Sequence, residues 1–385
     1  MAKSVIKSKL DKATEHAQRV DDWNNRMKDF YENTAKMDRF LADLHFVKLK
    51  NVNDSMPSLM REHGFKLESN VEDNRLPGSL SSGNTTYCKL VKYRWKGNKV
   101  ICRQYCFSTS VSREMMRTIG EGTRLMSYFG SRRKSAPYFL EVHKVFYNAP
   151  EDERQKMLFV MHEDFPSSSV ALHLWNCDVT PKEAIEWTLE LAKAAEWLNV
   201  TGVAHRFIRP ENVLLSGEGN VLLAGFDAAV SFYKLANDRE GEKFILQEPG
   251  LPREIPFELW DHLPAECFDK PYDPQFVDSW SIGVLLCTML TGSHPFEVDM
   301  AKLSTQAASL PQQWRQSTER ANVPYEGKDD DALRSLLDDI FQPAEQRMIT
   351  FDMIRDIRLL RVISPSKARI GPGVYYRIDN VSALW

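Results

Sequence analysis

Hydrophobic positions recur at steps of three and four residues through the first 50 residues, a segment that contains neither glycine nor proline. These steps place the positions on one face of a helix, interrupted at Thr34, and the other positions are mostly charged or polar. We predict one long helix or a helical hairpin. Its apolar face needs something to pack against, which is the rest of the chain, a second copy or another protein partner. The positions are Ile6, Leu10, Ala13, Ala17, Val20, Trp23, Met27, Phe30, Met37, Leu41 and Leu44.

The pattern then changes to short runs typical of strands. Residues 66–86 are rich in Gly, Ser, Asn and Pro and are predicted to be linker and loop. Two strand-like runs fill 87–107, and the Lys-Gly-Asn between them predicts a hairpin turn. A helical stretch and two further strand-like runs follow, so residues 60–165 predict a small sheet with one helix.

Beyond residue 165 the pattern is mainly helical. Thr180, Pro181 and Glu183 form a capped helix start with proline in the first turn. Two short strands come next, then a proline-rich loop over 248–274, and helices fill the remainder. A small sheet-rich lobe followed by a larger helical lobe, with a loop-rich cleft between them, is an α+β architecture.

Composition narrows the class of protein. The net charge of −3 over 385 residues gives no general attraction to nucleic acid or anionic lipid. The six cysteines include no CxxC pair, which argues against a zinc site and favours reduced thiols in the cytoplasm. The longest apolar run, at 280–290, is too short to span a membrane and is predicted to be a buried core helix.

Five sequence motifs occur in a recognisable order. HRFIRPEN at 205–212 resembles the H-R-D-L-x-x-x-N loop of the protein kinases, and LAGFD at 223–227 stands where those enzymes carry L-A-D-F-G. Downstream, PAE, DSWSIG and GSHPF resemble the A-P-E segment, the buried helix and the turn after it. QPAEQRM resembles the end of the kinase domain. Residues 270–350 resemble the calcium/calmodulin-dependent group, and within it the testis-specific serine/threonine kinases.

The resemblance covers about residues 75–360 and implies a bilobal kinase-like fold. It predicts a small lobe at 75–163, built from a five-stranded antiparallel sheet with one helix, and a larger, mainly helical lobe at 164–362. An N-terminal helical extension at 1–60 and a C-terminal tail at 363–385 complete the expected organisation.

Two positions of the resemblance depart from the chemistry of phosphoryl transfer. After His205 and Arg206, Phe207 occupies the position of the aspartate that accepts the hydroxyl proton, and a benzyl group has no lone pair. Gly225 occupies the position of the aspartate that holds Mg²⁺. Asn212 matches the second metal ligand but is neutral. Asp227, two residues beyond Gly225, is a candidate replacement if the loop shifts its register.

Other candidate nucleotide-binding positions are altered too. In the predicted phosphate-covering loop, Gly83 is the only matching glycine. Arg103 stands at the lysine position of V-A-I-K, with Glu121 as its predicted helix partner or else as an ordinary surface residue. Met161 is placed at the back of the nucleotide pocket or simply in the core. Arg209 replaces a phosphate-contacting lysine.

Several matched positions concern the shape of the fold. His205 and Phe226 match a packed stack through the core, and Asp278 matches a buried aspartate that holds the backbone of the 205–212 loop. Glu266 and Arg347 match an internal ion pair.

The resemblance therefore predicts a pseudokinase, which is no enzyme and acts as a scaffold or allosteric regulator through protein partners in the cytoplasm. No cofactor is expected, although ATP without Mg²⁺ is conceivable, and no nucleic acid or membrane partner is expected. A homodimer through the N-terminal helix is one predicted association. The alternative is an atypical ATP-binding serine/threonine kinase of weak activity that uses Asp227 as its metal ligand.

Overall fold

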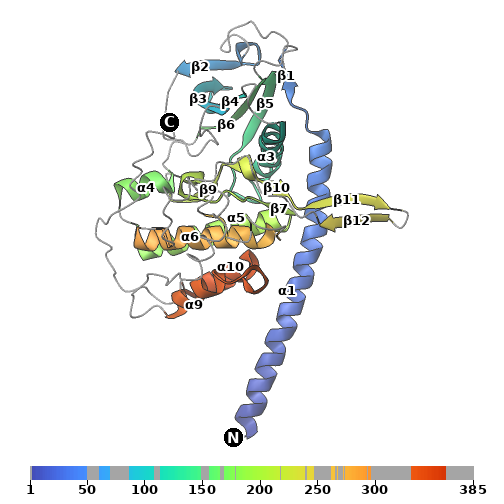
Figure 1. Ribbon diagram of the computed structural model, residues 1–385, viewed down its shortest axis with the longest axis vertical. Helices are drawn as coiled ribbons and strands as arrows, with labels where there is room; N and C mark the ends of the chain where they lie inside the picture. The colour runs from blue at the N-terminus through green and yellow to red at the C-terminus, as the bar shows by residue number, and fades with distance from the viewer. Residues whose placement is uncertain are drawn as a thin grey trace, which may run out of the picture.

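The structure is a computed structural model of the 385-residue chain. A sheet-rich lobe is stacked on a mainly helical lobe, and the long helix α1 runs along one side of both (Figure 1). The described residues are 2–49, 60–69, 86–107, 113–148, 156–164, 169–177, 179–216, 218–238, 241–246, 262–264, 267, 272, 274–292, 294–295 and 331–360.

Helix α1 is a single helix over Ala2–Asp43, as one of the two predicted forms of this segment requires. The C-terminal part of its predicted apolar face packs against the chain's own body: Met37 is fully buried, and Phe30 and Leu41 pack against the main hydrophobic core. Thr34, which interrupts the apolar stripe in the sequence, is also fully buried. From Arg26 onward, α1 therefore docks on its own chain, and association into a homodimer stays a prediction.

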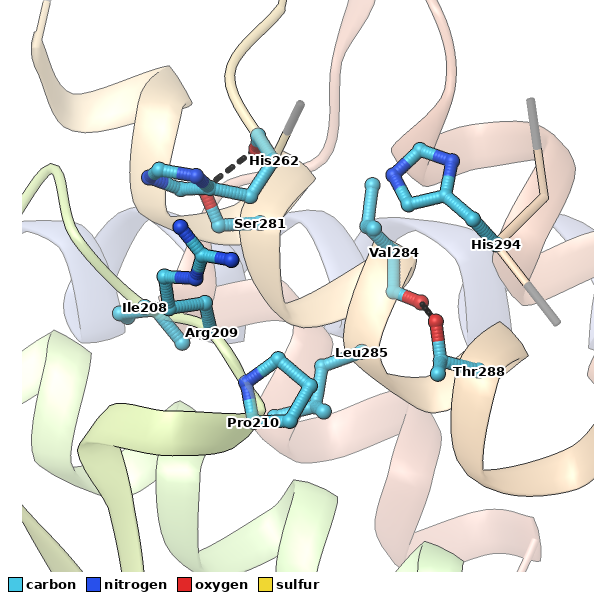
Figure 2. A pocket seen from close by; sticks show the side chains of 9 residues that line it. All are labelled: Ile208, Arg209, Pro210, His262, Ser281, Val284, Leu285, Thr288 and His294. Atoms are coloured by element: carbon cyan, nitrogen blue, oxygen red, sulfur yellow. Dashed lines mark hydrogen bonds between the residues drawn. The ribbon is translucent and has the colours of Figure 1, made fainter. Parts of the chain in front are cut away.

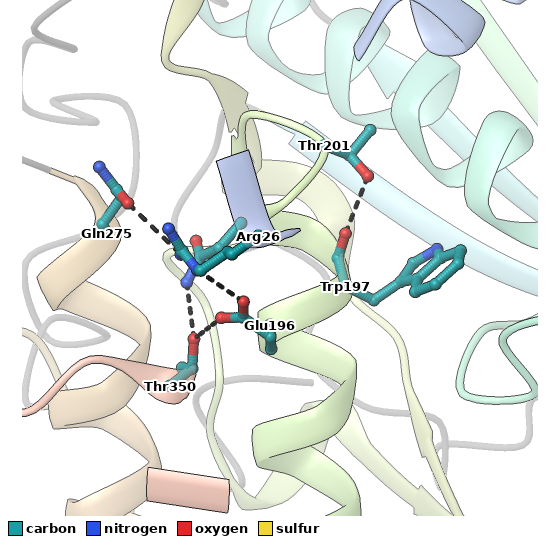
Figure 3. A network of polar contacts seen from close by, with 7 residues as sticks. Arg26, Glu196, Trp197, Thr201, Gln275 and Thr350 are labelled. Carbon is teal, nitrogen blue, oxygen red and sulfur yellow. Dashed lines mark hydrogen bonds and ion pairs between the residues drawn. The ribbon is translucent and has the colours of Figure 1, made fainter. Parts of the chain in front are cut away.

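A buried ion pair anchors α1 to the large lobe (Figure 3). Arg26 donates from Nε to Glu196 Oε1 on helix α5 (Pro181–Asn199) at 2.8 Å, and both side chains are nearly inaccessible to solvent. Thr350 donates to the second carboxylate oxygen at 2.8 Å and accepts from Asn199 Nδ2 at 2.9 Å. Burial raises the pKa of Glu196, whereas the Arg26 guanidinium and the Thr350 hydroxyl act in the opposite direction. The network joins α1 to helix α5 and to helix α10 (Thr350–Leu360).

The other end of α1 contacts the small-lobe helix α3, Arg113–Ser131. Arg124 donates to the carbonyl oxygens of Leu41 and Leu44, at and just beyond the C-terminal end of α1. The rings of Phe40 and Tyr128 meet edge to face with centroids 5.4 Å apart. Helix α1 thus holds α3 and the large lobe together.

The small lobe is a six-stranded mixed sheet in the order β1-β5-β6-β4-β3-β2. Strand β1 is parallel to β5, and all the other neighbours are antiparallel. The strands are β1 (Val47–Lys48), β2 (Phe65–Ser69), β3 (Thr86–Trp95), β4 (Asn98–Phe107), β5 (Val142–Asn148) and β6 (Lys156–Glu163).

Two features of this sheet differ from the sequence-based prediction. The sheet has six strands rather than five, because the segment after α1 adds β1 in a parallel register that no local pattern encodes. Strand β2 lies inside the segment predicted to be linker, where pairing with β3 stabilises it. The predicted hairpin between β3 and β4 is confirmed, and positive φ at Lys96 and Gly97 suits a tight two-residue turn.

Alternation along β4 gives the sheet two different faces. Val100 and Cys102 point into an apolar cluster with Phe65 and Phe146 on the outer face. Tyr105 packs with Phe107, α3 and Phe207 on the face toward the large lobe. The second face forms the roof of the candidate site.

The large lobe is built around two buried helices. Helix α5 (Pro181–Asn199) begins with the predicted capping box between Thr180 and Glu183. Helix α6 (Val277–Thr291) is buried on nearly all sides, as its uninterrupted apolar sequence predicts. Around them lie α4 (Val170–Asn176), α9 (Asp331–Ile340) and α10 (Thr350–Leu360), with short 3₁₀ turns η5 (Pro274–Phe276) and η7 (Ala344–Gln346).

Short strands and turns carry the candidate site between the lobes. They are β7 (Val203–Ala204), η1 (Pro210–Asn212), β8 (Val213–Leu215), β9 (Val221–Leu223), η2 (Phe226–Ala228) and β10 (Val230–Ser231). The chain continues into an antiparallel hairpin of β11 (Tyr233–Asp238) and β12 (Gly241–Leu246), which the sequence pattern did not predict. The predicted C-terminal tail at 363–385 lies outside the described residues. Among the helices that are described, none is both long and apolar enough to cross a membrane.

Replacing Arg26 tests the anchoring of α1. Arg26→Met leaves Glu196 buried without its cation, so we expect the free energy of unfolding to fall by about 3–5 kcal/mol in urea denaturation. The matched control is Lys36→Met, which removes an exposed pair with Glu32 on the same helix and should cost at most about 0.5 kcal/mol. Equal effects of the two substitutions would show that the buried network does not anchor the helix.

Candidate functional site

The loop that follows β7 is held by one buried carboxylate. Asp278, at the start of α6, accepts the backbone N–H of His205 on Oδ2 and that of Arg206 on Oδ1, both at 2.8 Å. Burial raises the pKa of Asp278 to about 6, although these two amides and Arg206 favour the charged form. Arg206 has a left-handed φ of 58°, a conformation uncommon for a residue other than glycine. The predicted role of Asp278 in fixing this loop is confirmed.

A stack of four rings runs from this loop into the small lobe. The His205 and Phe226 rings have centroids 4.9 Å apart, and Phe226 lies 6.0 Å from Phe129 on α3 and 5.9 Å from Phe139. All four side chains are buried. The predicted packing role of His205 and Phe226 is therefore confirmed, and the stack aligns α3 with the loop.

Phe207 is a core residue and not a solvent-facing one. Its side chain is fully buried in the cluster with Tyr105 and Ile119, and its ring lies 5.6 Å from that of His262. The Phe207 carbonyl accepts a hydrogen bond from Asn212 Nδ2 at 2.8 Å. The position offers no proton acceptor to a substrate hydroxyl, as the sequence indicates.

Gly225 is required by close packing as well as by its backbone conformation. Its φ of 77° is left-handed, and a Cβ placed there would lie 2.4 Å from the side chain of Asn212. Asn212 thus occupies the space that a larger residue 225 would need. Within the described part of the chain, Asn212 Oδ1 is buried and has no hydrogen-bond partner.

Asp227 reaches the small lobe instead of solvent. Its Oδ1 accepts a hydrogen bond from the Tyr105 hydroxyl at 2.6 Å, and its Oδ2 lies 3.6 Å from Nη1 of Arg103. Arg103 Nη1 also donates to the Tyr105 oxygen at 3.2 Å. All three side chains are buried. Burial raises the pKa of Asp227, whereas Arg103 and Tyr105 act in the opposite direction.

Helix α3 approaches this cluster through a glycine. A Cβ at Gly122 would lie 1.9 Å from the carbonyl oxygen of Phe226, so only glycine permits the contact between α3 and η2. Glu121, the predicted partner of Arg103, precedes Gly122 on the helix and is half-buried. The structure instead pairs Arg103 with Asp227.

Met161 lies in the core, the second of its two predicted placements. It is paired with Cys102 and is buried in the outer-face cluster with Phe65. His162, the next residue, points to the same side as Arg103 because successive strand residues alternate. Burial, and then the nearby charge of Arg103, lowers the pKa of His162 to about 3.

Arg209 lines a small cavity next to α6 (Figure 2). Its Nε donates to Glu211 at 2.8 Å, and its guanidinium lies 5.9 Å from the Phe207 ring centroid. The cavity volume of about 10 Å³ is enough for roughly one water and too small for a phosphate group. The cavity is also lined by Ile208, Pro210, His262, Ser281, Val284, Leu285, Thr288 and His294.

Two other predicted residues lie outside the described part of the chain, namely Gly83 and Glu266. The predicted pair of Glu266 with Arg347 therefore stays a prediction. Arg347 itself is buried, donates to the carbonyl oxygens of Gln342 and Phe276 at 3.1 and 3.0 Å, and stacks on the Trp280 ring at 4.7 Å. These contacts fix the end of the large lobe against α6.

Two buried oxygen atoms could face a divalent cation. Asn212 Oδ1 and Asp227 Oδ2 are both buried and, among the described residues, make no hydrogen bond. Oxygen ligands are the type that Mg²⁺ prefers, and two protein oxygens suffice when phosphate and water complete the octahedron. No group of three or more His, Cys, Asp or Glu side chains suited to a metal occurs in the described ranges. These two oxygens are the candidate donors to an Mg²⁺ ion bound together with a nucleotide.

The comparisons with known proteins agree on one family. Residues 80–359 match the family described as "Protein kinase domain". The chain is similar to serine/threonine-protein kinase hal4 of Schizosaccharomyces pombe, at 28% identity over 49% of this chain and 28% of that protein. It is also similar to serine/threonine-protein kinase CHK1 of Mycosarcoma maydis, at 31% identity over 43% of this chain and 22% of that protein. The match thus spans less than a third of either relative.

These comparisons correct one expectation. The prediction that the chain is no enzyme is contradicted, because the curated relatives that it matches are named serine/threonine-protein kinases. Phe207 removes a proton acceptor and Gly225 removes a metal ligand, but these two departures do not establish inactivity. The comparisons do not single out the testis-specific group.

Substitution of Gly225 tests the close packing on Asn212. Gly225→Ala adds both left-handed strain and a clash with Asn212, so we expect a loss of about 2–4 kcal/mol in urea unfolding. Gly219→Ala is the matched control, because its φ of 81° is similar but nothing lies within 4 Å of the added Cβ. The control should cost about 1 kcal/mol. Equal losses would argue against the clash.

The buried imidazole of His162 predicts a pH effect. In the folded protein the pKa of His162 is about 3, below its ordinary value of about 6.5. As the pH falls below about 6.5, the unfolded chain therefore binds a proton at this residue that the folded chain does not. His162 should therefore make stability fall by about 1.4 kcal/mol per pH unit between pH 6 and 4. Urea unfolding of His162→Leu across this range should show a slope shallower by that amount. His45→Gln, at an exposed position, is the control, and an unchanged slope in His162→Leu would refute the assignment.

Proposed function

Because the chain belongs to the protein kinase family, we propose that it is an atypical serine/threonine protein kinase of low turnover. It would transfer the terminal phosphoryl group of ATP to a hydroxyl group of a protein substrate. The observation that carries this proposal is the pair of buried oxygens, Asn212 Oδ1 and Asp227 Oδ2, which have no hydrogen-bond partner among the described residues.

Positioning favours this function. Phosphoryl transfer has a loose transition state, so catalysis consists largely of alignment and charge stabilisation rather than covalent chemistry. The loop held by Asp278 and the ring stack through Phe226 supply a rigid frame for such alignment.

The charges around the cleft also suit a nucleotide. Asp227 and Asn212 would hold Mg²⁺, which when bound neutralises charge that develops on the phosphate oxygens. Arg103 lies beside Asp227 on the roof of the cleft and would contact a phosphate as a planar, permanently charged fork. In the alternative of ATP bound without metal, Arg103 would attract the phosphates.

The absent base limits the rate. Phe207 cannot accept the hydroxyl proton, which would pass to solvent or to the phosphate oxygens. Loss of general-base help costs about 10²–10⁴ in rate, and kinases turn over at about 1–100 s⁻¹. We therefore expect a turnover in the range of about 10⁻⁴–1 s⁻¹.

The substrate class follows from the names of the relatives, which are serine/threonine-protein kinases. A protein partner is accordingly part of the proposal, and its identity is left to experiment. A cytoplasmic location stays a prediction.

Transfer of labelled phosphate tests the proposal. Purified chain is incubated with γ-³²P-ATP and a mixed serine/threonine substrate, with Mg²⁺ or with EDTA. We expect slow incorporation that needs Mg²⁺ and falls at least about tenfold in Asp227→Asn, because the carboxylate ligand is lost. Asp338→Asn, at an exposed position on α9, is the control and should leave the rate unchanged.

Two outcomes would contradict the proposed kinase. One is incorporation that Asp227→Asn leaves unchanged, which would indicate a contaminating enzyme. The other is thermal stabilisation by ATP that EDTA does not alter, together with no incorporation, which would indicate a nucleotide bound without metal or turnover.

A further inference from the structure

One hydrogen bond links the two lobes directly at the candidate metal ligand. Tyr105 lies on β4 of the small lobe, and Asp227 lies 122 residues later in the turn η2. The Tyr105 hydroxyl donates to Asp227 Oδ1 at 2.6 Å, a short distance typical of a bond to a charged acceptor. The sequence reasoning did not single out Tyr105.

Tyr105 is itself rigidly placed. Strand β4 is a central strand with β3 on one side and β6 on the other. The Tyr105 ring stacks on that of Phe107, with centroids 6.2 Å apart and planes 6° apart. Its hydroxyl accepts from Arg103 and donates to Asp227, so both of its hydrogen-bonding functions are used. The hydroxyl therefore offers its proton in one fixed direction.

The bond decides which oxygen of Asp227 remains available. Oδ1 is engaged by Tyr105, whereas Oδ2 makes no hydrogen bond among the described residues and faces Arg103. A carboxylate held by one oxygen presents the other in a defined direction. Partners that orient a ligand in this way typically account for a factor of 10–100 in metal affinity.

We propose that Tyr105 is a positioning residue that fixes the Asp227 carboxylate across the lobe interface and aims Oδ2, the oxygen that also faces Arg103, at the metal of a bound nucleotide. This inference rests on the proposed function for its metal. The link between β4 and η2 does not depend on that function. The hydrogen bond between Tyr105 and Asp227 joins the lobes beside the ion pair between Arg103 and Asp227.

The substitution Tyr105→Phe removes only the hydroxyl and keeps the buried ring. Mg²⁺ is titrated against the ATP complex by calorimetry, and we expect its dissociation constant to rise about 10–100-fold in Tyr105→Phe. ATP affinity measured in EDTA should change far less. A general disturbance of the site would instead weaken the binding of ATP and of Mg²⁺ alike. Tyr93→Phe is the matched control, since Tyr93 is equally buried but lies in the outer-face cluster.

A second readout does not depend on metal. The folding equilibrium constant is measured in urea for Tyr105→Phe, Asp227→Ala and the double variant. We expect Tyr105→Phe to lower this constant about 10–100-fold in the parent chain, the range for a bond to a charged group. In the Asp227→Ala background the loss should be less than about threefold, because the acceptor is gone.

The outcomes separate the two proposals. If the parent chain binds Mg²⁺ with ATP and Tyr105→Phe binds it equally well, the positioning role is refuted while the proposed function stands. If the parent chain shows no Mg²⁺-dependent binding, the proposed function fails, and the cycle alone decides on Tyr105. Loss of coupling between Tyr105 and Asp227 in that cycle would refute the positioning role as well.

Discussion

The buried carboxylate of Asp278 is the constraint on which the rest of the site depends. It accepts two consecutive backbone N–H groups, those of His205 and Arg206, and so holds the loop in a conformation that includes a left-handed arginine. Such a conformation persists only where the surroundings determine it fully. Because the loop is fixed, His205 can stack on Phe226, and that stack in turn sets the position of η2 beneath the small lobe. Removing an acceptor of this kind would leave two buried donors unsatisfied.

The same frame explains why the polar residues of the cleft are redistributed rather than simply missing. The Asn212 side chain lies where a side chain at position 225 would be, and the next carboxylate along the chain is two residues further on. Asp227 contacts Arg103 and Tyr105 on strand β4 of the small lobe. Gly122 permits this arrangement, since α3 must come close to the Phe226 carbonyl. The charges of the site are thus concentrated across the interface between the lobes.

Helix α1 extends this coupling to the outside of the molecule. It is tied to the large lobe by Arg26 and to α3 by the contact of Phe40 with Tyr128 and by Arg124. Since α3 in turn touches η2, helix α1 is linked to the candidate site through α3. A buried ion pair is weak evidence for net stability, but it specifies one docking position, since any other would leave a charge buried alone.

The sequence by itself determined the elements whose signals are local. These include the helical stripe of α1, the β3–β4 hairpin, the capping box of α5 and the apolar helix α6, together with the motif positions such as Asp278, because periodicity, turn residues and spacing are all read within a short window. Only the tertiary structure decided which side chains meet at the site. The Arg26–Glu196 pair spans 170 residues and the Tyr105–Asp227 bond spans 122, so no local pattern indicates either. Strand register also decided that His162, and not Met161, shares a face with Arg103, because a shift of one residue reverses every side chain.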